Sequence, residues 1–256
     1  MYRFTSSPSI GTGRQFFQTK PQSANLPVKM GRESMQQPDD STILDVQTGE
    51  LSHVLIGHSG LSLQKVCVLS GSFNPLHEGH QKMAEIAVAK TGRELVYELC
   101  LQNVDKPALT VESARQRIRQ PFAPHSVLLT GSPTFEEKSK LFPGATFVVG
   151  ADTIQRIADP AYYDNDPGKR DLAINVIRDA GCRFLVFGRD TASWKRSEES
   201  NRSKSHDSKS DSFHTLSEMS LPQSLVAICD EVSRSEFDCG VSSTEIRNRH
   251  DSPKAE

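Results

Sequence analysis

Short apolar runs alternate with stretches of helical periodicity through the middle of the chain, and this alternation limits the fold more than any other feature. Runs with the length and composition of buried strands occupy residues 66–69, 95–101, 126–130, 146–150, 183–188 and 225–229. Helical stretches are predicted over 80–91, 110–120 and 153–158, in a segment that ends at 175–180, and from about residue 244. Strands that alternate with helices favour an α/β fold, a Rossmann-like parallel sheet with helices on both faces.

Two polar segments interrupt this pattern. Residues 1–60 are expected to form a tail that is poorly ordered or contributes only a partial element. Residues 191–220 contain ten serines among charged side chains, with almost no apolar residue before Phe213. Such a composition buries too little surface to offset chain entropy, so we expect a mobile insertion there. A single domain over residues 65–250 would carry this insertion.

Composition excludes several classes of function. The net charge of -2 argues against a general nucleic-acid binder, and no stretch reaches the roughly 18 apolar residues of a membrane span. The five cysteines form no C-x-x-C pair, which is typical of reduced thiols and of a cytoplasmic or nuclear protein. Residues 1–32 are basic and contain no Asp or Glu, so a mitochondrial transit peptide is the alternative. Small-molecule partners are expected, and the oligomeric state is left open.

The segment 71–80, GSFNPLHEGH, directly follows the first strand run. Gly71 permits a sharp turn and a close approach of a phosphate to the backbone. His77 and His80 flank Gly79 where the next helix begins. Because a helix N-terminus presents free N–H groups and a partial positive charge, two imidazoles beside it form a site for a polyphosphate. A zinc site is less favoured because a third ligand at suitable spacing is missing, and no residue is assigned to a metal.

A second motif, VSSTEIR, occupies residues 241–247. Its first serine and its glutamate have the spacing of a capping box, so a helix is predicted to begin here. Ser243 and Thr244 add hydroxyl groups at the start of that helix, and Arg247 offers a forked cation to phosphates. A plain capped helix would explain the motif by itself. Its position after the last strand run favours phosphate binding.

Together the two motifs resemble the HxGH and ISSTxxR signatures of the nucleotidyltransferase superfamily. That superfamily includes nicotinamide mononucleotide adenylyltransferases, phosphopantetheine adenylyltransferases and cytidylyltransferases. The resemblance implies that His77 and His80 contact triphosphate oxygens and stabilise the transition state, with Arg247 as the third catalytic residue. It also implies that the nucleotide is bound by Gly71, Ser72, Phe73, Asn74, Ser242, Ser243 and Thr244.

Further site residues are expected at the ends of later strand runs. The run FVVGADTI is similar to the GAD segment of nicotinamide mononucleotide adenylyltransferases, which implies that Gly150 and Asp152 lie at the nucleotide. Helix N-capping is the alternative role for this aspartate. Arg189 ends a strand run and is expected to face the triphosphate. Lys106 is expected to reach the phosphate of the acceptor, with a solvated lysine in a turn as the alternative. Tyr162 is assigned to the acceptor because it lies near the position where those adenylyltransferases carry a tryptophan.

The combination of GSFNP, GAD and SSTEIR favours transfer of AMP from ATP to nicotinamide mononucleotide, with release of pyrophosphate. This reaction belongs to NAD biosynthesis, and Mg²⁺ is expected to accompany ATP. Two alternatives stay open. One is cytidylyl or adenylyl transfer to another phosphate acceptor, such as phosphocholine or phosphopantetheine. The other is a nucleotide-binding protein without turnover.

Overall fold

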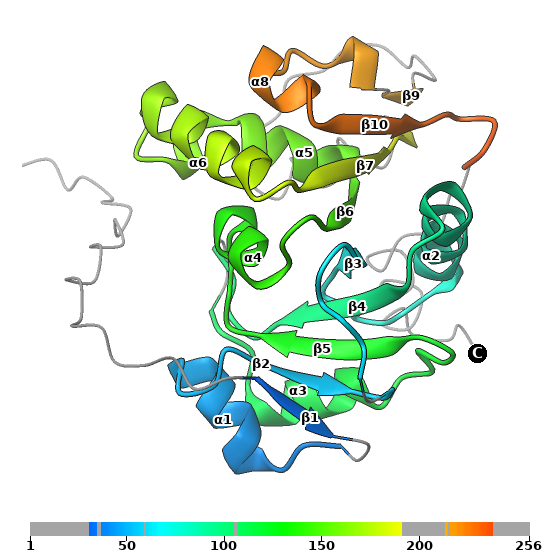
Figure 1. Cartoon of the computed structure of the whole chain (residues 1–256), viewed down its shortest axis with the longest axis vertical. Coiled ribbons are helices and arrows are strands. Elements are labelled where there is room, and N and C mark those ends of the chain that lie inside the picture. The colour runs from blue at the N-terminus through cyan, green and yellow to red at the C-terminus, as the bar shows by residue number, and fades with distance from the viewer. Residues whose placement is uncertain are drawn as a thin grey trace, which may run out of the picture.

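One large sheet organises the molecule (Figure 1). The computed structural model describes residues 31–34, 37–58, 60–104, 107–190, 213–214 and 216–237. Within these residues the chain forms an eight-stranded sheet in the order β1-β2-β5-β4-β3-β6-β7-β10, with helices on both faces. The predicted α/β class, with a mostly parallel sheet, is therefore confirmed.

Six of the strands run parallel to one another and form the centre of the sheet. They are β3 (Cys67–Ser70), β4 (Leu95–Cys100), β5 (Ser126–Thr130), β6 (Thr146–Gly150), β7 (Arg183–Phe187) and β10 (Cys229–Val232). Five of the six follow the predicted strand runs closely. Four of these five are buried on both sides throughout most of their length, and the fifth, β7, is buried after its first residue. This burial explains why their sequences read as continuous apolar runs rather than as an alternation.

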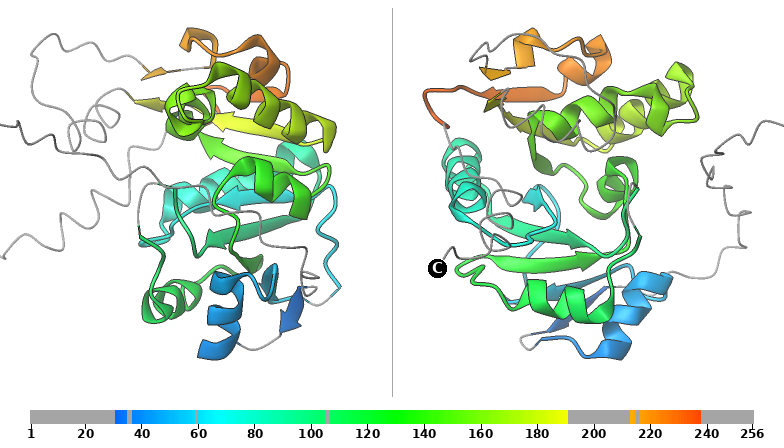
Figure 2. Two further views of the ribbon diagram at one scale, coloured as in Figure 1. Left: turned by 90° about the vertical axis from the view of Figure 1, so that its left-hand side faces the viewer. Right: turned by 180° about the vertical axis from the view of Figure 1, so that it is seen from behind.

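Helices cover both faces of the sheet, and Figure 2 shows the two layers from the side and from behind. One face carries α1 (Asp40–Thr48), α2 (Glu78–Thr91) and α3 (Val111–Ile118). The other carries α4 (Phe135–Leu141), α5 (Ala151–Ala158), α6 (Pro167–Asp179) and α8 (Gln223–Val226). Among the described helices, none combines the length and the apolar character that crossing a bilayer requires.

Local signals at the helix ends agree with the sequence. The side chain of Thr110 accepts a hydrogen bond from Ser113 N at 3.1 Å and caps α3, as predicted. The carboxylate of Asp166 accepts from Gly168 N at 2.8 Å and caps α6. The helix α2 ends at Gly92, whose φ of 63° lies in the left-handed region that glycine adopts at little cost.

The strand order reverses at β3. From β3 the chain builds β4 and β5 on one side, and it then returns to place β6 against the other side of β3. In open parallel sheets such a reversal leaves a crevice beyond the carboxyl ends of the two neighbouring strands. The HxGH segment follows β3 and the GAD segment follows β6. Both motifs therefore lie at the reversal.

The prediction of a strand over residues 225–229 is wrong. The helix α8 ends at Val226, and β10 begins only at Cys229. The apolar run spans the end of one element and the start of the next, with Leu225 and Ile228 both buried. A run of this length does not distinguish a helix end from a strand, because either can bury it. The true edge strand carries exposed acidic residues and so has no apolar run of its own.

Residues 32–56, within the expected tail, extend the sheet. The strand β2 (His53–Ile56) pairs antiparallel with β5, and β1 (Arg32–Ser34) pairs parallel with β2. Between them, α1 buries Ile43 and Val46 in the core. The segment contributes a pair of strands and a helix, which its few apolar runs did not indicate.

The serine-rich insertion begins and ends at a short ribbon. β8 (Arg189–Asp190) pairs antiparallel with β9 (Phe213–His214), and residues 191–212 lie outside the described part of the chain. The 3-10 helix η2 (Leu216–Glu218) follows, and Leu216 packs against the hydrophobic core. The last part of the predicted insertion, residues 216–220, therefore belongs to the packed domain.

A buried ion pair connects α4 to the sheet near its carboxyl edge. Lys138 Nζ donates to both carboxylate oxygens of Glu98, at 2.8 and 2.7 Å, and the hydroxyl of Thr130 donates to the same carboxylate. The side chains of Lys138 and Glu98 are 5% and 0% exposed. Removing one partner of such a pair leaves an uncompensated buried charge.

We therefore expect Lys138→Met to lower the free energy of unfolding by about 3–5 kcal/mol in urea titrations. Lys140→Met is the matched control, because Lys140 lies on the same helix but is 61% exposed in its ion pair with Glu136. Its loss should cost at most about 1 kcal/mol. Adding Glu98→Gln to Lys138→Met should recover part of the lost stability. Equal effects of the two lysine substitutions would contradict this account.

Candidate active site

The loop after β3 folds around the ring of Phe73. This side chain is fully buried, and its backbone has a φ of 41°, in the left-handed region. A Cβ atom on Gly71 would lie 2.7 Å from Cε1 of that ring. Glycine is thus required at residue 71 for packing within the loop, a reason that the sequence did not reveal.

The same ring joins the candidate site to the hydrophobic core. Its centroid lies 5.4 Å from the rings of both Tyr97 and Phe122, in edge-to-face geometry. It lies 5.2 Å from the imidazole of His80, again edge to face. Such contacts hold aromatic rings in defined orientations. The position of His80 therefore depends on a core residue seven positions earlier in the chain.

The two histidines form the beginning of α2. His77 is the N-cap residue, and its Nδ1 accepts a hydrogen bond from Gly79 N at 3.1 Å. His80 Nδ1 accepts from His77 N at 3.3 Å, and the two rings stack with centroids 3.8 Å apart. The two side chains thus bond to N–H groups at the start of the helix, as in a capping box.

These bonds define the tautomer of both imidazoles. A backbone N–H can only donate, so the Nδ1 atom that it bonds must be the unprotonated nitrogen of the ring. In the neutral state the proton of each imidazole is therefore on Nε2. Both His77 and His80 then offer an Nε2–H donor of the kind that phosphate oxygens accept.

Long-range ¹⁵N–¹H correlation spectra at alkaline pH, where imidazole is neutral, test this tautomer. We expect His77 and His80 to show the Nε2–H form, with Nδ1 at the shift of an unprotonated nitrogen. His58 is an internal reference, because its Nε2 lies 3.1 Å from the carbonyl oxygen of Pro124 and must donate to it. An Nδ1–H tautomer at His77 or His80 would contradict the assignment.

Asp152 lies at the carboxyl end of the neighbouring strand. The N-cap of α5 is Gly150, which makes no side-chain capping bond, and Asp152 is the second residue of the helix. Its Oδ1 lies 2.8 Å from the position that a Cβ on Gly150 would occupy. The carboxylate therefore folds back over the strand end and is half-buried. The alternative role of Asp152 as the N-cap is excluded, because Gly150 holds that position.

The structure places some of the other predicted residues and leaves several undescribed. Ser72 and Asn74 are exposed in the loop after β3. Tyr162 ends the 3-10 helix η1 (Pro160–Tyr162) and is 38% exposed. Its neighbour Tyr163 donates to Ile157 O at 3.2 Å, and burial raises its pKa. Outside the described residues lie Lys106, the side chain of Arg189, and Ser242, Ser243, Thr244 and Arg247.

Two polar side chains at the end of α3 contact the loop and were not predicted. Gln120 Nε2 donates to Phe73 O at 2.7 Å, and Gln120 Oε1 accepts from Leu76 N at 2.6 Å. Arg117 Nη1 donates to Ser72 O at 2.9 Å. These residues are more than forty positions from the loop in sequence, and they belong to no motif. Only the fold brings them to the site.

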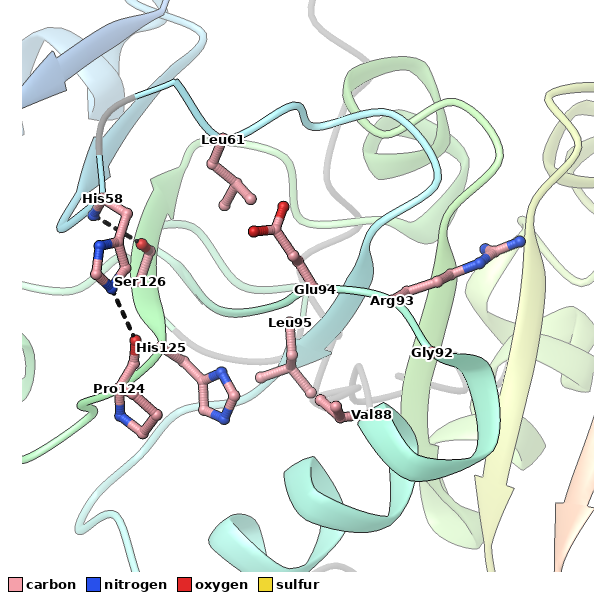
Figure 3. A pocket seen from close by; sticks show the side chains of 10 residues that line it. All are labelled: His58, Leu61, Val88, Gly92, Arg93, Glu94, Leu95, Pro124, His125 and Ser126. Atoms are coloured by element: carbon pink, nitrogen blue, oxygen red, sulfur yellow. Dashed lines mark hydrogen bonds between the residues drawn. The ribbon is translucent and has the colours of Figure 1, made fainter.

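A second pair of histidines lines a cavity at the opposite edge of the sheet (Figure 3). The cavity has a volume of about 400 Å³ and lies where β4 and β5 begin. His58, His125 and Glu94 line it together with apolar side chains. The hydrogen bonds of His58 go to Pro124 O and to Ser126 Oγ. This cavity lies at the edge of the sheet opposite to the HxGH and GAD segments.

The described residues contain no group of three or more His, Cys, Asp or Glu side chains arranged to hold a metal ion.

A family model with the description "Cytidylyltransferase-like" matches residues 68–249. The matched region begins within β3 and includes the HxGH, GAD and SSTEIR segments. A search of curated proteins found no match.

Proposed function

We propose that this chain, which belongs to the cytidylyltransferase-like family of nucleotidyltransferases, transfers AMP from ATP to nicotinamide mononucleotide. Its membership of the family follows from the match over residues 68–249. Pyrophosphate is the second product. The observation that carries the proposal is the pair of stacked imidazoles at the N-terminus of α2, beside the point where the strand order reverses. Nucleotides bind at such points in parallel sheets.

The N-terminus of α2 is well suited to the triphosphate. The helix is 14 residues long, and the partial positive charge at its N-terminus favours an anion. The Nε2–H groups of His77 and His80 add two donors at the same place. Donors held in advance at the position where negative charge develops stabilise a transition state without reorganisation.

The proposed reaction is a direct displacement. A phosphate oxygen of the acceptor attacks the α-phosphorus of ATP, and a new P–O bond forms. The bond from the α-phosphorus to the oxygen that bridges to the β-phosphorus breaks, and pyrophosphate leaves with that electron pair. Because the nucleophile is already an anion, no general base and no covalent enzyme intermediate are needed. Catalysis then depends on positioning and on charge neutralisation.

The C-terminal motif is proposed to bind the same phosphates from the other side. The ring of Phe237, the last described residue, lies 5.0 Å from the ring of Phe187 and 5.8 Å from Lys82 Nζ on α2. Figure 1 shows the chain after β10 turning toward α2. Ser242 follows five residues later, and an extended chain spans about 17 Å over that number of residues. This length of chain is what motivates our proposal that residues 242–247 bind the phosphates at the start of α2.

Magnesium is proposed to enter with ATP. One or two carboxylates together with phosphate oxygens and water form an ordinary ligand set for this ion. Asp152, half-buried at the carboxyl end of β6, is the carboxylate that we assign to it. The ion would neutralise charge on the phosphates during transfer.

For the acceptor we propose the ring of Tyr162 as a stacking surface and Lys106 as a phosphate contact.

Pyrophosphate release in the presence of paired donors and acceptors tests the substrates. We expect ATP with nicotinamide mononucleotide to give the fastest release and NAD as the product. Faster release from CTP, or with phosphocholine or phosphopantetheine, would replace this assignment by another transfer reaction. Tight ATP binding with no release from any pair would favour a nucleotide-binding protein without turnover.

His80→Ala should lower kcat by about 10²–10³-fold, the usual cost of removing one donor from a developing charge. His58→Ala is the control, since His58 lines the cavity at the opposite edge of the sheet. It should leave kcat unchanged within about twofold, well below the tenfold that 1.36 kcal/mol represents. A His80→Ala enzyme with wild-type turnover would remove the histidine pair from the reaction.

A further inference from the structure

We propose that Gln120 is a positioning residue for His77 and His80, because its side-chain amide bridges the backbone of the loop that carries them. This inference rests on the proposed function, since positioning matters only if the two imidazoles contact the nucleotide. Gln120 lies two residues beyond the end of α3 and is half-buried. Within the described residues its side-chain amide bonds to backbone groups and to neither imidazole, so its effect would pass through the loop.

The bridge closes the loop across four residues. Gln120 Nε2 donates to Phe73 O at 2.7 Å, and its Oε1 accepts from Leu76 N at 2.6 Å. Arg117, one helical turn earlier, holds Ser72 O at 2.9 Å. Side chains from the end of α3 thus satisfy three backbone groups of the loop. Buried or half-buried backbone groups in irregular segments need such partners.

The backbone of Gln120 is itself fixed, so the amide is held in place. Gln120 N donates to Arg117 O at 3.3 Å, and Phe122 N donates to Gln120 O at 2.9 Å. Gln120 Nε2 also donates to Arg117 O at 3.0 Å. The ring of Phe122 packs against the ring of Phe73. The bridge is therefore anchored at both ends in the same part of the core.

Only an amide makes both bonds of the bridge. Its nitrogen donates to a carbonyl, and its oxygen accepts from an N–H group. A carboxylate of the same shape could accept from Leu76 N, but it would turn an oxygen toward Phe73 O, where no proton is available. Gln120→Glu therefore breaks one half of the bridge without removing volume. The Gln120→Glu variant therefore measures the effect of the hydrogen bonds without a change in the packing of the side chain.

The bridge opposes a strain in the loop. Phe73 holds a φ of 41°, in the left-handed region that a non-glycine residue rarely adopts. Such a conformation persists only where the surroundings determine it. The bonds to Phe73 O and Leu76 N fix the peptide groups on either side of this region. Leu76 directly precedes His77, the N-cap of α2, and the Phe73 ring contacts His80. Release of the bridge would therefore move both imidazoles.

Three variants test the proposal by turnover: Gln120→Ala, Gln120→Glu and the control Gln116→Ala. Gln116 is the same residue type on the exposed side of α3. We expect both Gln120 variants to lose about 10- to 100-fold in kcat, because a shift of about 1 Å at a catalytic group has an effect of that order. The KM for ATP should change by less than the kcat, and Gln116→Ala should match the wild type in both.

Hydrogen–deuterium exchange over residues 72–80 provides a readout that needs no substrate. Both Gln120 variants should exchange faster there than the wild type, whereas exchange in β4 and β6 stays the same. Unchanged exchange in the loop would overturn the bridge. Faster exchange with wild-type kcat would overturn its role in positioning. If the wild type releases no pyrophosphate with any substrate pair, the proposed transfer fails, and the exchange result still decides whether the bridge exists.

Discussion

The placement of β3 at the reversal of strand order is the constraint on which the rest of the site depends. Because β4 lies on one side of β3 and β6 on the other, the loops after β3 and β6 lie side by side at the edge where parallel sheets bind ligands. The start of α2 is thereby directed at whatever binds there. A helix N-terminus attracts anions, and at this edge of the sheet the start of α2 lies near the GAD segment that follows β6.

A buried polar cluster joins the neighbouring strands to α4 near the same edge of the sheet. The bonded cluster of Glu98, Lys138 and Thr130 joins three elements just below the carboxyl edge. Gly71 N, the last backbone donor before the loop, bonds Glu98 O at 3.1 Å. The loop after β3 is held by the buried ring of Phe73 and by side chains at the end of α3. The imidazoles are oriented by backbone N–H groups at the start of α2, and His80 is held in addition by the ring of Phe73. Electrostatic catalysis requires such preorganisation, because donors that must move into place lose part of their effect.

Much of this arrangement was predictable from sequence, because its signals are local. A buried strand that ends in glycine, a helix that begins at a histidine and a threonine cap each depend on a few neighbouring residues. Gln120 carried no signal, since its role depends on partners forty-four and forty-seven positions away. The N-terminal strands were also missed, because β2 is short and β1 has no buried residue among those whose burial is described. The apolar run at 225–229 led to a wrong strand prediction, because burial alone does not distinguish the end of a helix from a strand.

The central claim is that the two imidazoles at the start of α2 bind the triphosphate. A crystal structure with Mg²⁺ and a non-hydrolysable ATP analogue tests it most directly. The account predicts triphosphate oxygens within hydrogen-bond distance, about 2.7–3.2 Å, of Nε2 of both His77 and His80. Triphosphate bound elsewhere, for example in the cavity lined by His58 and His125 at the opposite edge, would contradict it.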